Sequence, residues 1–557
     1  MSDGGTTWRV DQLPRGLEEL DEAVLDEATR RLGVTASGVE SWRVSRRAID
    51  ARGRRSPRFV LSLEVDLREG VVPQVSDGVP ARRVVVPEVR AMPRLLPGDA
   101  RPVVIGAGPC GYFAALQLAE AGLRPVVLDR GREVERRAKD VSRLMGRGEI
   151  TADSNLCFGE GGAGTWSDGK LYTRVGGPRV REVLETIVRQ GGPERILVDA
   201  RPHLGTDRLV SLLKRFRAAL TELGAELRYD ARVESIESSG GRFRAVRLAS
   251  GERVEGTHCV LAMGHSARDL YARLAQDGVA MEPKAFAMGF RIEHPQALID
   301  RLQYGEWAGH EALPAAYYEL KAQVGRGASE VGVYSFCMCP GGSVVPTPTR
   351  EGEVCVNGMS HAARSGSRAN SALVVTVSPE RFGSLLRRPW EGHGALVGMG
   401  LQQEAEAAAW RAGGGAFRAP AQRVADFLAG SGPGGELPRS TYRCGVTPAG
   451  LAGLYPAPIV DALRLAIERF DRRMPGYGGE DGLLLGVETR TSAPVTMLRD
   501  RQRLESPSME GLYPAGEGAG YGGGIVSAAI DGLRVADAIV SSVSGETVGD
   551  RFGGEGR

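Results

Sequence analysis

Cysteine is scarce in this sequence, and long apolar runs are missing. The seven cysteines, an odd number, are spread over 557 residues, which does not fit the disulfide framework of a small secreted domain. No apolar stretch reaches the roughly 20 residues that cross a bilayer, and the N-terminus lacks the basic and apolar segments of a secretory signal. We therefore expect a cytoplasmic protein without a membrane partner.

An excess of charge of one sign is also missing. The 71 basic and 69 acidic residues leave a net charge of +2, so we expect no bulk attraction to nucleic acid. Lysine is rare, and most basic residues are arginine. Cys337 and Cys339 have a CxC spacing without a compact set of further Cys or His residues, which argues against a metal site.

Glycine, in contrast, is abundant and clustered. The 77 glycines exceed the average share of about 7%. They concentrate in residues 106–111, 159–169 and 516–524. Such clustering indicates main chain that lies directly against a ligand.

The first cluster has the spacing of a dinucleotide-binding turn. An apolar, strand-like run precedes Gly106, Gly108 and Gly111, which form GxGxxG, and a second apolar run ends at Asp129, 23 residues after Gly106. We expect a helix that begins near Pro109 to direct its N–H groups at a diphosphate. The carboxylate of Asp129 stands where such units bind ribose hydroxyls.

Three further segments favour FAD over a nicotinamide dinucleotide. Arg232–Glu234, Thr257–Gly264 and Leu512–Glu517 resemble, in this order, segments that grip FAD in two-dinucleotide-fold flavoproteins. The resemblance implies non-covalent FAD, since no attachment residue is evident, with NAD(P)H as a transient electron donor. The implied FAD contacts are Gly106, Gly108, Pro109, Gly111, Asp129, Arg130, Gly161, Gly162, Gly164, Thr165, Val233, Met263, Gly264, Gly516, Glu517, Gly523, Gly524 and Ile525.

Longer motifs carry a closer resemblance. Residues 155–171, 334–342, 356–360 and 486–492 are similar to those of a bacterial family of uncharacterised FAD-dependent (NAD/FAD-utilising) dehydrogenases. The resemblance covers almost the full chain. It implies an α/β fold with a glutathione-reductase-like FAD-binding Rossmann domain, into which an α+β substrate domain is inserted.

The N-terminal part predicts a separate ferredoxin-like βαββ unit at residues 1–99. Its strands are expected at Trp8–Leu13, Val39–Ile49 and Phe59–Leu67, and its helix at Leu17–Leu32. Deleting this unit is expected to leave FAD binding at least partly intact. The remaining boundaries are predicted as a first part of the FAD domain at 100–281, a substrate domain at 282–480 and a C-terminal return to the FAD domain at 481–557.

Five polar residues are candidates for a reactive pocket between the FAD domain and the substrate domain. They are Asp168, Lys170, Cys337, Cys339 and His361. A purely cofactor-clamping role is the alternative for Asp168 and Lys170, and a structural role is the alternative for His361. The two thiols are alternatively small apolar side chains that line a core or pocket.

The expected function is that of an FAD-dependent oxidoreductase, a dehydrogenase or reductase that moves a hydride between flavin and a small organic metabolite. A flavin-dependent monooxygenase is one alternative. A non-catalytic flavoprotein with a regulatory or binding role is another. Turnover of NAD(P)H in air separates an enzyme from a scaffold, and coupled oxygen insertion identifies a monooxygenase.

Overall fold

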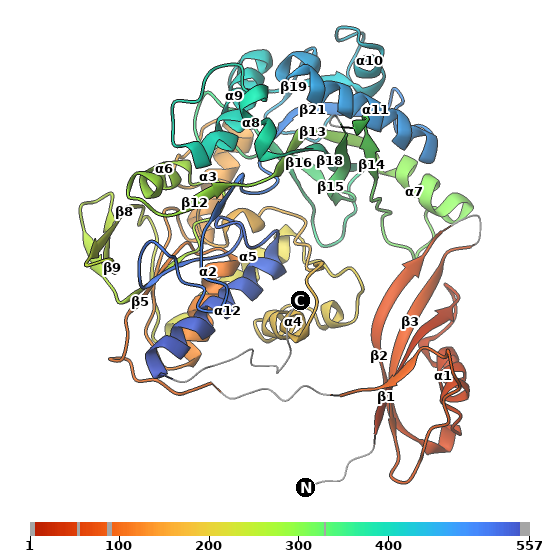
Figure 1. Ribbon diagram of the computed structural model, residues 1–557. Coiled ribbons are helices and arrows are strands. Elements are labelled where there is room, and N and C mark those ends of the chain that lie inside the picture. The colour runs from red at the N-terminus through yellow and green to blue at the C-terminus, as the bar shows by residue number, and fades with distance from the viewer. Residues whose placement is uncertain (1–5, 53–55, 86–91, 328–329, 546–557) are drawn as a thin grey trace.

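The chain forms three units, as Figure 1 shows for the computed structural model. The structure describes residues 6–52, 56–85, 92–327 and 330–545. A four-stranded N-terminal sheet stands beside a unit that is built on a five-stranded parallel sheet. A third unit, built on a seven-stranded sheet, lies above the parallel sheet in the view of Figure 1.

The N-terminal unit is an antiparallel sheet with the strand order β2-β3-β1-β4. The alternating residues Phe59, Leu61, Leu63, Val65 and Leu67 are all buried, because one face of the sheet packs on the helix and the other residues face outward. The βαββ order is therefore present, and its description as ferredoxin-like stays a prediction. The elements are β1 (Thr7–Arg15), α1 (Leu25–Leu32), β2 (Val39–Asp50), β3 (Arg58–Leu67) and β4 (Ala81–Arg83).

The expected start of the first helix at Leu17 is wrong. A 3-10 turn, Asp21–Val24, precedes α1, which ends at Gly33 in the left-handed conformation. Leu20 is 73% exposed, so the apolar residues before Asp21 do not belong to the buried helical face. The apolar spacing resembled a helical stripe, but only the residues from Val24 onward face the sheet.

The five-stranded sheet is parallel and has the order β23-β11-β5-β6-β7. The glycine turn connects β5 to α2, which crosses back to β6. The chain leaves this sheet after β11 and returns at β23, so residues more than 240 positions apart in the sequence pair directly. The strands are β5 (Pro102–Ile105), β6 (Val126–Leu128), β7 (Glu226–Arg228), β11 (His258–Leu261) and β23 (Leu512–Pro514).

Helices cover this sheet and a small three-stranded sheet, β10-β9-β8, lies beside it. The chain passes from the small sheet to the parallel sheet at Gly256, where a Cβ would lie 2.9 Å from the Arg101 carbonyl oxygen. The elements are α2 (Pro109–Glu120), α3 (Val134–Arg147), α4 (Pro178–Arg189), α5 (Thr206–Glu222), α6 (Arg268–Gln276), α12 (Ile525–Ser544), β8 (Val233–Ser239), β9 (Arg242–Leu248) and β10 (Arg253–Glu255).

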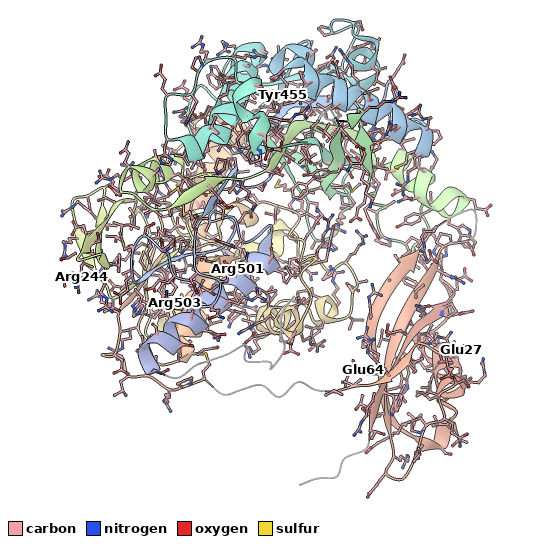
Figure 2. All side chains as sticks on the ribbon, viewed as in Figure 1. Glu27, Glu64, Arg244, Tyr455, Arg501 and Arg503 are labelled. Atoms are coloured by element: carbon pink, nitrogen blue, oxygen red, sulfur yellow. The ribbon has the colours of Figure 1, made fainter. Side chains whose placement is uncertain are left out.

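The third unit is a mixed sheet of order β14-β15-β18-β13-β21-β19-β20 with helices packed against it. Tyr455 lies inside it (Figure 2), and its hydroxyl donates a hydrogen bond of 2.6 Å to the Gly289 carbonyl. Its strands are β13 (Phe286–Pro295), β14 (Lys321–Val324), β15 (Val331–Cys339), β18 (Arg368–Val377), β19 (Ala419–Arg423), β20 (Val446–Pro448) and β21 (Leu483–Glu488).

Two short two-stranded sheets and five helices complete the unit and connect it to the parallel sheet. The helices are α7 (Gln296–Tyr304), α8 (Pro379–Leu385), α9 (Val397–Gly413), α10 (Val424–Ala429) and α11 (Ala457–Arg473). The paired strands are β12 (Met281–Pro283) with β22 (Val495–Met497), and β16 (Ser343–Pro346) with β17 (Val356–Met359). Among the residues that the structure describes, no helix combines the length and apolarity needed to cross a membrane.

Residues 92–100 pack against the unit of the parallel sheet. Leu95 is buried in its core cluster, and the Leu95 amide donates to the Ala121 carbonyl at 2.7 Å. The N-terminal sheet itself makes a narrower contact: the main chain of Arg47 exchanges two hydrogen bonds of 2.8 Å with Val198 and Ala200. The packing boundary therefore falls before Met92, some residues ahead of the predicted limit at residue 99.

Two N-terminal truncations test this boundary. A chain that starts at Met92 should remain folded, because it loses only peripheral contacts: those around Arg47, the ion pair of Glu18 with His310, and the packing of Ala51 and Ala312. A chain that starts at Ala100 also loses Leu95, and should be less stable by about 2–5 kcal/mol, as for removal of a buried leucine side chain. Urea unfolding of both chains measures the difference, and equal stabilities would contradict the boundary.

Candidate functional site

A pocket lies between the parallel sheet and the seven-stranded unit. Its wall contains the glycine turn after β5, the loop at 157–170, the segment after β11, Glu517 and the start of α12. Cys337 and Asn357 come from the third unit. The segments 159–170, 337–342 and 516–525 therefore each contribute residues to one cavity.

The middle of the pocket fits an anionic, elongated ligand. A Cβ placed on Gly108 would meet only the Cα of Gly162, at 3.9 Å, and a Cβ on Gly264 or Gly524 would meet nothing within 4 Å. The main chain is thus bare where it faces the cavity. Two helices, α2 and α12, begin at this wall without a side-chain cap, and helix N-termini attract phosphate oxygens.

One end of the pocket is built mainly by residues that follow β6 and β7. The Asp129 carboxylate lines it and accepts hydrogen bonds of 2.8 Å from the amides of Ala107 and Gly131. Arg130 lies over the Phe158 ring at 4.2 Å and is paired with two aspartates. Val233, at the start of β8, completes this end. Carboxylate and flat side chains together suit a ribose and an adenine.

The loop at 155–165 is held from behind by Arg137. Its fully buried guanidinium donates to the carbonyls of Asn155, Leu156, Gly159, Glu160 and Gly162 at 2.6–3.2 Å. Burial lowers the pKa of Arg137 to about 10, so the side chain remains a cation at neutral pH. Sequence reasoning missed this residue, because one arginine on an amphipathic helix carries no local signal.

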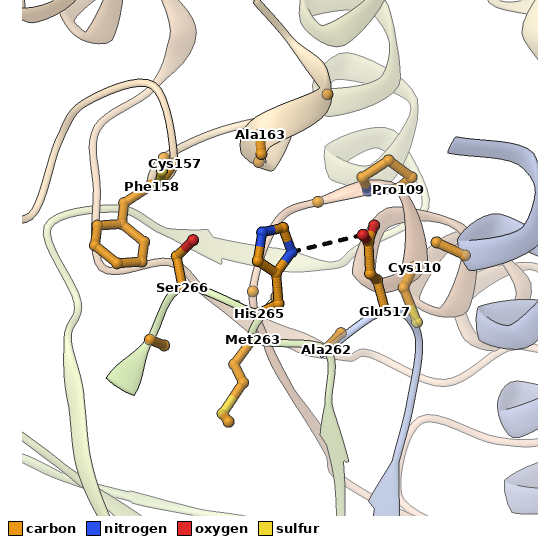
Figure 3. Close-up of a pocket in the computed structure, with 18 of the residues that line it drawn as sticks. Pro109, Cys110, Cys157, Phe158, Ala163, Ala262, Met263, His265, Ser266 and Glu517 are labelled. Atoms are coloured by element: carbon orange, nitrogen blue, oxygen red, sulfur yellow. Dashed lines mark ion pairs between the residues drawn. The ribbon is translucent and has the colours of Figure 1, made fainter. Parts of the chain in front are cut away.

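His265 and Glu517 face each other across the middle of the pocket (Figure 3), with 3.6 Å between Nδ1 and Oε1. Burial raises the pKa of Glu517 to about 7. Burial, followed by the nearby Arg490 and Arg268, lowers the pKa of His265 to about 4. At neutral pH the imidazole is therefore uncharged and the carboxyl is close to its titration midpoint.

The other end of the pocket carries fixed charges. Asp168 is fully buried and pairs with Lys170 at 3.2 Å, with Arg364 at 3.0 Å and with the Ser360 hydroxyl. Burial alone would raise the pKa of Asp168, but Lys170 and Arg364 hold it below its usual range. The pKa of Lys170 is raised by the nearby thiols and Asp168, in spite of burial. Both groups stay charged, which suits a positioning role rather than proton transfer.

Thirteen of the eighteen residues predicted to contact FAD line the pocket. The other five do not line it, and some of these lie behind its wall. Gly111, for example, lets α2 approach the turn, since a Cβ there would lie 1.8 Å from the Gly106 carbonyl oxygen. The residues outside the lining are Gly111, Gly161, Thr165, Gly516 and Gly523. The lining residues are Gly106, Gly108, Pro109, Asp129, Arg130, Gly162, Gly164, Val233, Met263, Gly264, Glu517, Gly524 and Ile525.

 One of the lining residues, Pro109, cannot donate a hydrogen bond from its main chain. Pro109, at the first position of α2, lines the cavity but has no N–H group to offer a phosphate. Proline at this position starts the helix without losing a hydrogen bond, so its contribution is to the geometry of the turn.

The prediction for His361 is wrong. Its side chain is 69% exposed, outside the pocket, and lies 3.8 Å from Asp207. The turn after β17 is fixed by a hydrogen bond from the Ala362 amide to Asp207, and this turn directs His361 to solvent. Cys339 also does not line the cavity: it is fully buried behind Cys337, which does.

Arg291, Glu488 and Arg364 at the charged end were not predicted. Arg291 and Glu488 form a buried ion pair at 3.1 Å, and Arg364 holds Asp168. Arg490 lines the pocket, but its guanidinium is committed to Glu406 at 2.7 Å. These partners come from strands and helices that are far apart in the sequence, so no local pattern reveals them.

Gly108→Val tests the glycine wall. The branched side chain would fill the space that a diphosphate needs, so FAD binding should be lost. The folded protein should change in stability by less than about 1 kcal/mol, since Gly108 precedes the helix and faces the cavity. FAD content and thermal unfolding measure the two effects. Gly111→Ala is the matched control, and it should lower stability because its Cβ has no room. Stoichiometric FAD in Gly108→Val would contradict the assignment.

Glu517 gives a pH-dependent prediction. Its raised pKa makes the carboxyl neutral below pH 7 and charged above it, where it repels an anionic ligand. FAD affinity should therefore fall by up to about tenfold as the pH rises by one to two units through 7. Titration of the apo-protein with FAD measures this change. Glu517→Gln should remove the dependence, and an unchanged slope in that variant would refute the cause.

Comparison with known proteins supports the same cofactor. The family described as "FAD-dependent protein, C-terminal domain-like" matches residues 285–491, and a domain of unknown function matches residues 12–66. A protein of Clostridium beijerinckii, described as uncharacterised, is 39% identical over 540 residues, which cover 96% of this chain and 98% of the relative.

Solved structures show weaker similarity. CtdE in complex with FAD is 11% identical with a TM-score of 0.32, covering 79% of this chain and 84% of its own. The halogenase PltM in complex with ethyl mercury and mercury is 10% identical with a TM-score of 0.34, covering 82% and 72%. Similarity this low supports no conclusion about activity. The identity to the Clostridium protein extends over nearly the whole chain, and the chain belongs to its family, a family of uncharacterised FAD-dependent proteins.

Proposed function

We propose that the protein is an FAD-dependent oxidoreductase, a dehydrogenase or reductase acting on a small organic metabolite, with NAD(P)H as a transient electron donor. The proposal rests on one observation: the pocket has a middle part that is lined by glycine main chain and an end that is lined by charged side chains. Bare glycine main chain and two helix N-termini lie in its middle, and the fixed charges of Asp168 and Lys170 lie at one end.

In this proposal the residues of the pocket bind FAD and orient its flavin ring. In this proposal Asp129, Arg130 and Val233 hold the adenosine half, the starts of α2 and α12 face the diphosphate, and the charged end receives the flavin ring. Bound FAD supplies hydride transfer at that ring. The domain arrangement that we propose is glutathione-reductase-like, with residues 282–480 covering the substrate and the N-terminal unit outside the chemistry.

Lys170 is a positioning residue in this scheme. Its ammonium already contacts Asp168 at 3.2 Å and two sulfur atoms at 3.9 Å, so it does not need to touch substrate. Its cation lies at the end of the pocket assigned to the flavin ring. A fixed cation beside the ring stabilises the negative charge that develops when flavin accepts a hydride.

The first experiment asks whether the protein is an enzyme. The FAD-loaded protein is mixed with NADH or NADPH without oxygen, and bleaching of the flavin is followed. Rapid bleaching supports an oxidoreductase, and re-oxidation by added metabolites identifies the substrate class. NAD(P)H consumption coupled to oxygen insertion would instead identify a monooxygenase. A flavin that no nicotinamide nucleotide or metabolite reduces would leave a non-catalytic flavoprotein and overturn the proposal.

Lys170→Met tests the electrostatic role. Loss of the cation should lower the midpoint potential of the flavin by about 30–60 mV, because about 30 mV corresponds to 1.4 kcal/mol for a two-electron couple. The rate of flavin reduction should fall by about 10–100-fold. Lys139→Met, at an exposed site on α3, is the matched control and should change neither quantity. An unchanged potential in Lys170→Met would show that the cation is purely structural.

A further inference from the structure

The two cysteines at the end of β15 occupy an irregular piece of main chain. Between Phe336 and Cys339 the pairing with β18 shifts, so three steps along β15 match two steps along β18. Cys337 has a φ of 47°, a left-handed conformation that costs a residue other than glycine about 1 kcal/mol or more. Such bulges re-aim side chains next to functional sites.

The bulge places both sulfur atoms around one cation. Lys170 Nζ lies 3.9 Å from the sulfur of Cys337 and 3.9 Å from that of Cys339. A second cation, Arg291, donates to the Cys339 sulfur at 3.4 Å and to the Cys337 carbonyl at 2.9 Å. Lysine is rare in this chain, and cations beside a thiol stabilise its thiolate.

The two thiols also interact with each other and hold different protonation states. The Cys339 thiol donates to the Cys337 carbonyl at 3.3 Å, and the neighbouring Cys339 side chain, together with Lys170 and Arg291, lowers the pKa of Cys337 in spite of burial. The pKa of Cys339 is raised by the same pairing and by burial. At neutral pH the pair therefore holds one proton, on Cys339, and one negative charge, on Cys337.

Only one of the two thiols faces the cavity. Cys337 lines the pocket next to Ser167, Asp168 and Lys170, at the end assigned to the flavin ring, whereas Cys339 is fully buried behind it. A thiolate in the pocket wall and a protonated thiol behind it are the arrangement in which one sulfur exchanges electrons with a ligand and the other completes the disulfide.

We propose that Cys337 and Cys339 form a dithiol–disulfide couple that exchanges an electron pair with the FAD of the proposed function, with Cys337 facing the flavin. This inference rests on that function for the position of the flavin ring. It adds a second two-electron centre to the pocket.

The exchange balances without a further reactant. In the oxidative direction the Cys339 S–H bond breaks and an S–S bond forms between the two residues. The electron pair and the Cys339 proton pass to oxidised flavin, which becomes the anionic reduced flavin. The single negative charge begins on the Cys337 thiolate and ends on the flavin. The reverse reaction reopens the disulfide.

The number of electrons that the FAD-loaded protein takes up tests whether the two cysteines form a redox couple. FAD-loaded protein, oxidised in air and then made anaerobic, is titrated with dithionite while the flavin absorbance is followed. Wild-type protein should take up two electrons per FAD beyond the two that flavin itself accepts. Cys337→Ser and Cys339→Ser should each lose the extra pair. Cys444→Ser, a half-buried cysteine outside the pocket, should keep it. Uptake of two electrons only by the wild-type protein would overturn the proposal.

A measurement on the polypeptide separates this inference from the proposed function. After oxidation, alkylation and digestion, the peptide that contains Cys337 and Cys339 should lack two hydrogens and carry no alkyl group. In the reduced protein without FAD, Cys337 should react with iodoacetamide at a lower pH than Cys444 does, because the neighbouring Cys339, Lys170 and Arg291 lower the pKa of Cys337, whereas burial raises that of Cys444. Absence of FAD binding with this thiol behaviour intact would refute the proposed function. A free, unreactive thiol pair in FAD-loaded protein would refute the couple alone.

Discussion

The shape of the pocket depends on one buried cation. Arg137 projects from α3 into the back of the loop at 155–165 and donates hydrogen bonds to five main-chain carbonyls there. A loop this rich in glycine has little side-chain packing to fix it and loses much conformational entropy on ordering. A guanidinium has five N–H donors in a rigid plane, and here it replaces the missing packing. The front of the loop is thereby left bare for a ligand.

The shape of the pocket also requires that α2 and α12 approach each other closely. A Cβ on Gly532 of α12 would lie 2.2 Å from the Cys110 carbonyl oxygen in α2, so glycine permits this contact. Because α2 follows β5 and α12 follows β23, this packing aligns the first helix after the glycine turn with the last helix of the chain. Both N-termini then reach the same cavity. The long insertion between β11 and β23 can form a separate unit without disturbing that alignment.

The sequence predicts those parts of the structure that are encoded locally. The turn at Gly106–Gly111 and the acid at Asp129 depend on spacing within one βαβ unit, and the alternation of Phe59 to Leu67 depends on one strand. Three segments of the pocket wall, 106–111, 159–169 and 516–524, stand out in the sequence because each is dense in glycine. The orientation of His361 was not, because a turn fixed by Asp207 in another element decides it. Arg291, Glu488 and Arg137 are ordinary residues in sequence and acquire their roles only from distant partners.

The charged side chains that the third unit places near the pocket are paired with side chains of opposite charge. Arg291 is balanced by Glu488, and Arg364 by Asp168, both within the protein interior. Lys170 adds one further cation to that set, beside two thiols. A buried cation without a counter-ion is costly, and Asp168 is already shared with Arg364. A thiolate on Cys337 supplies the missing negative charge. The charge balance of this end of the pocket is therefore itself a physical reason for Cys337 to lose its proton, independent of any ligand.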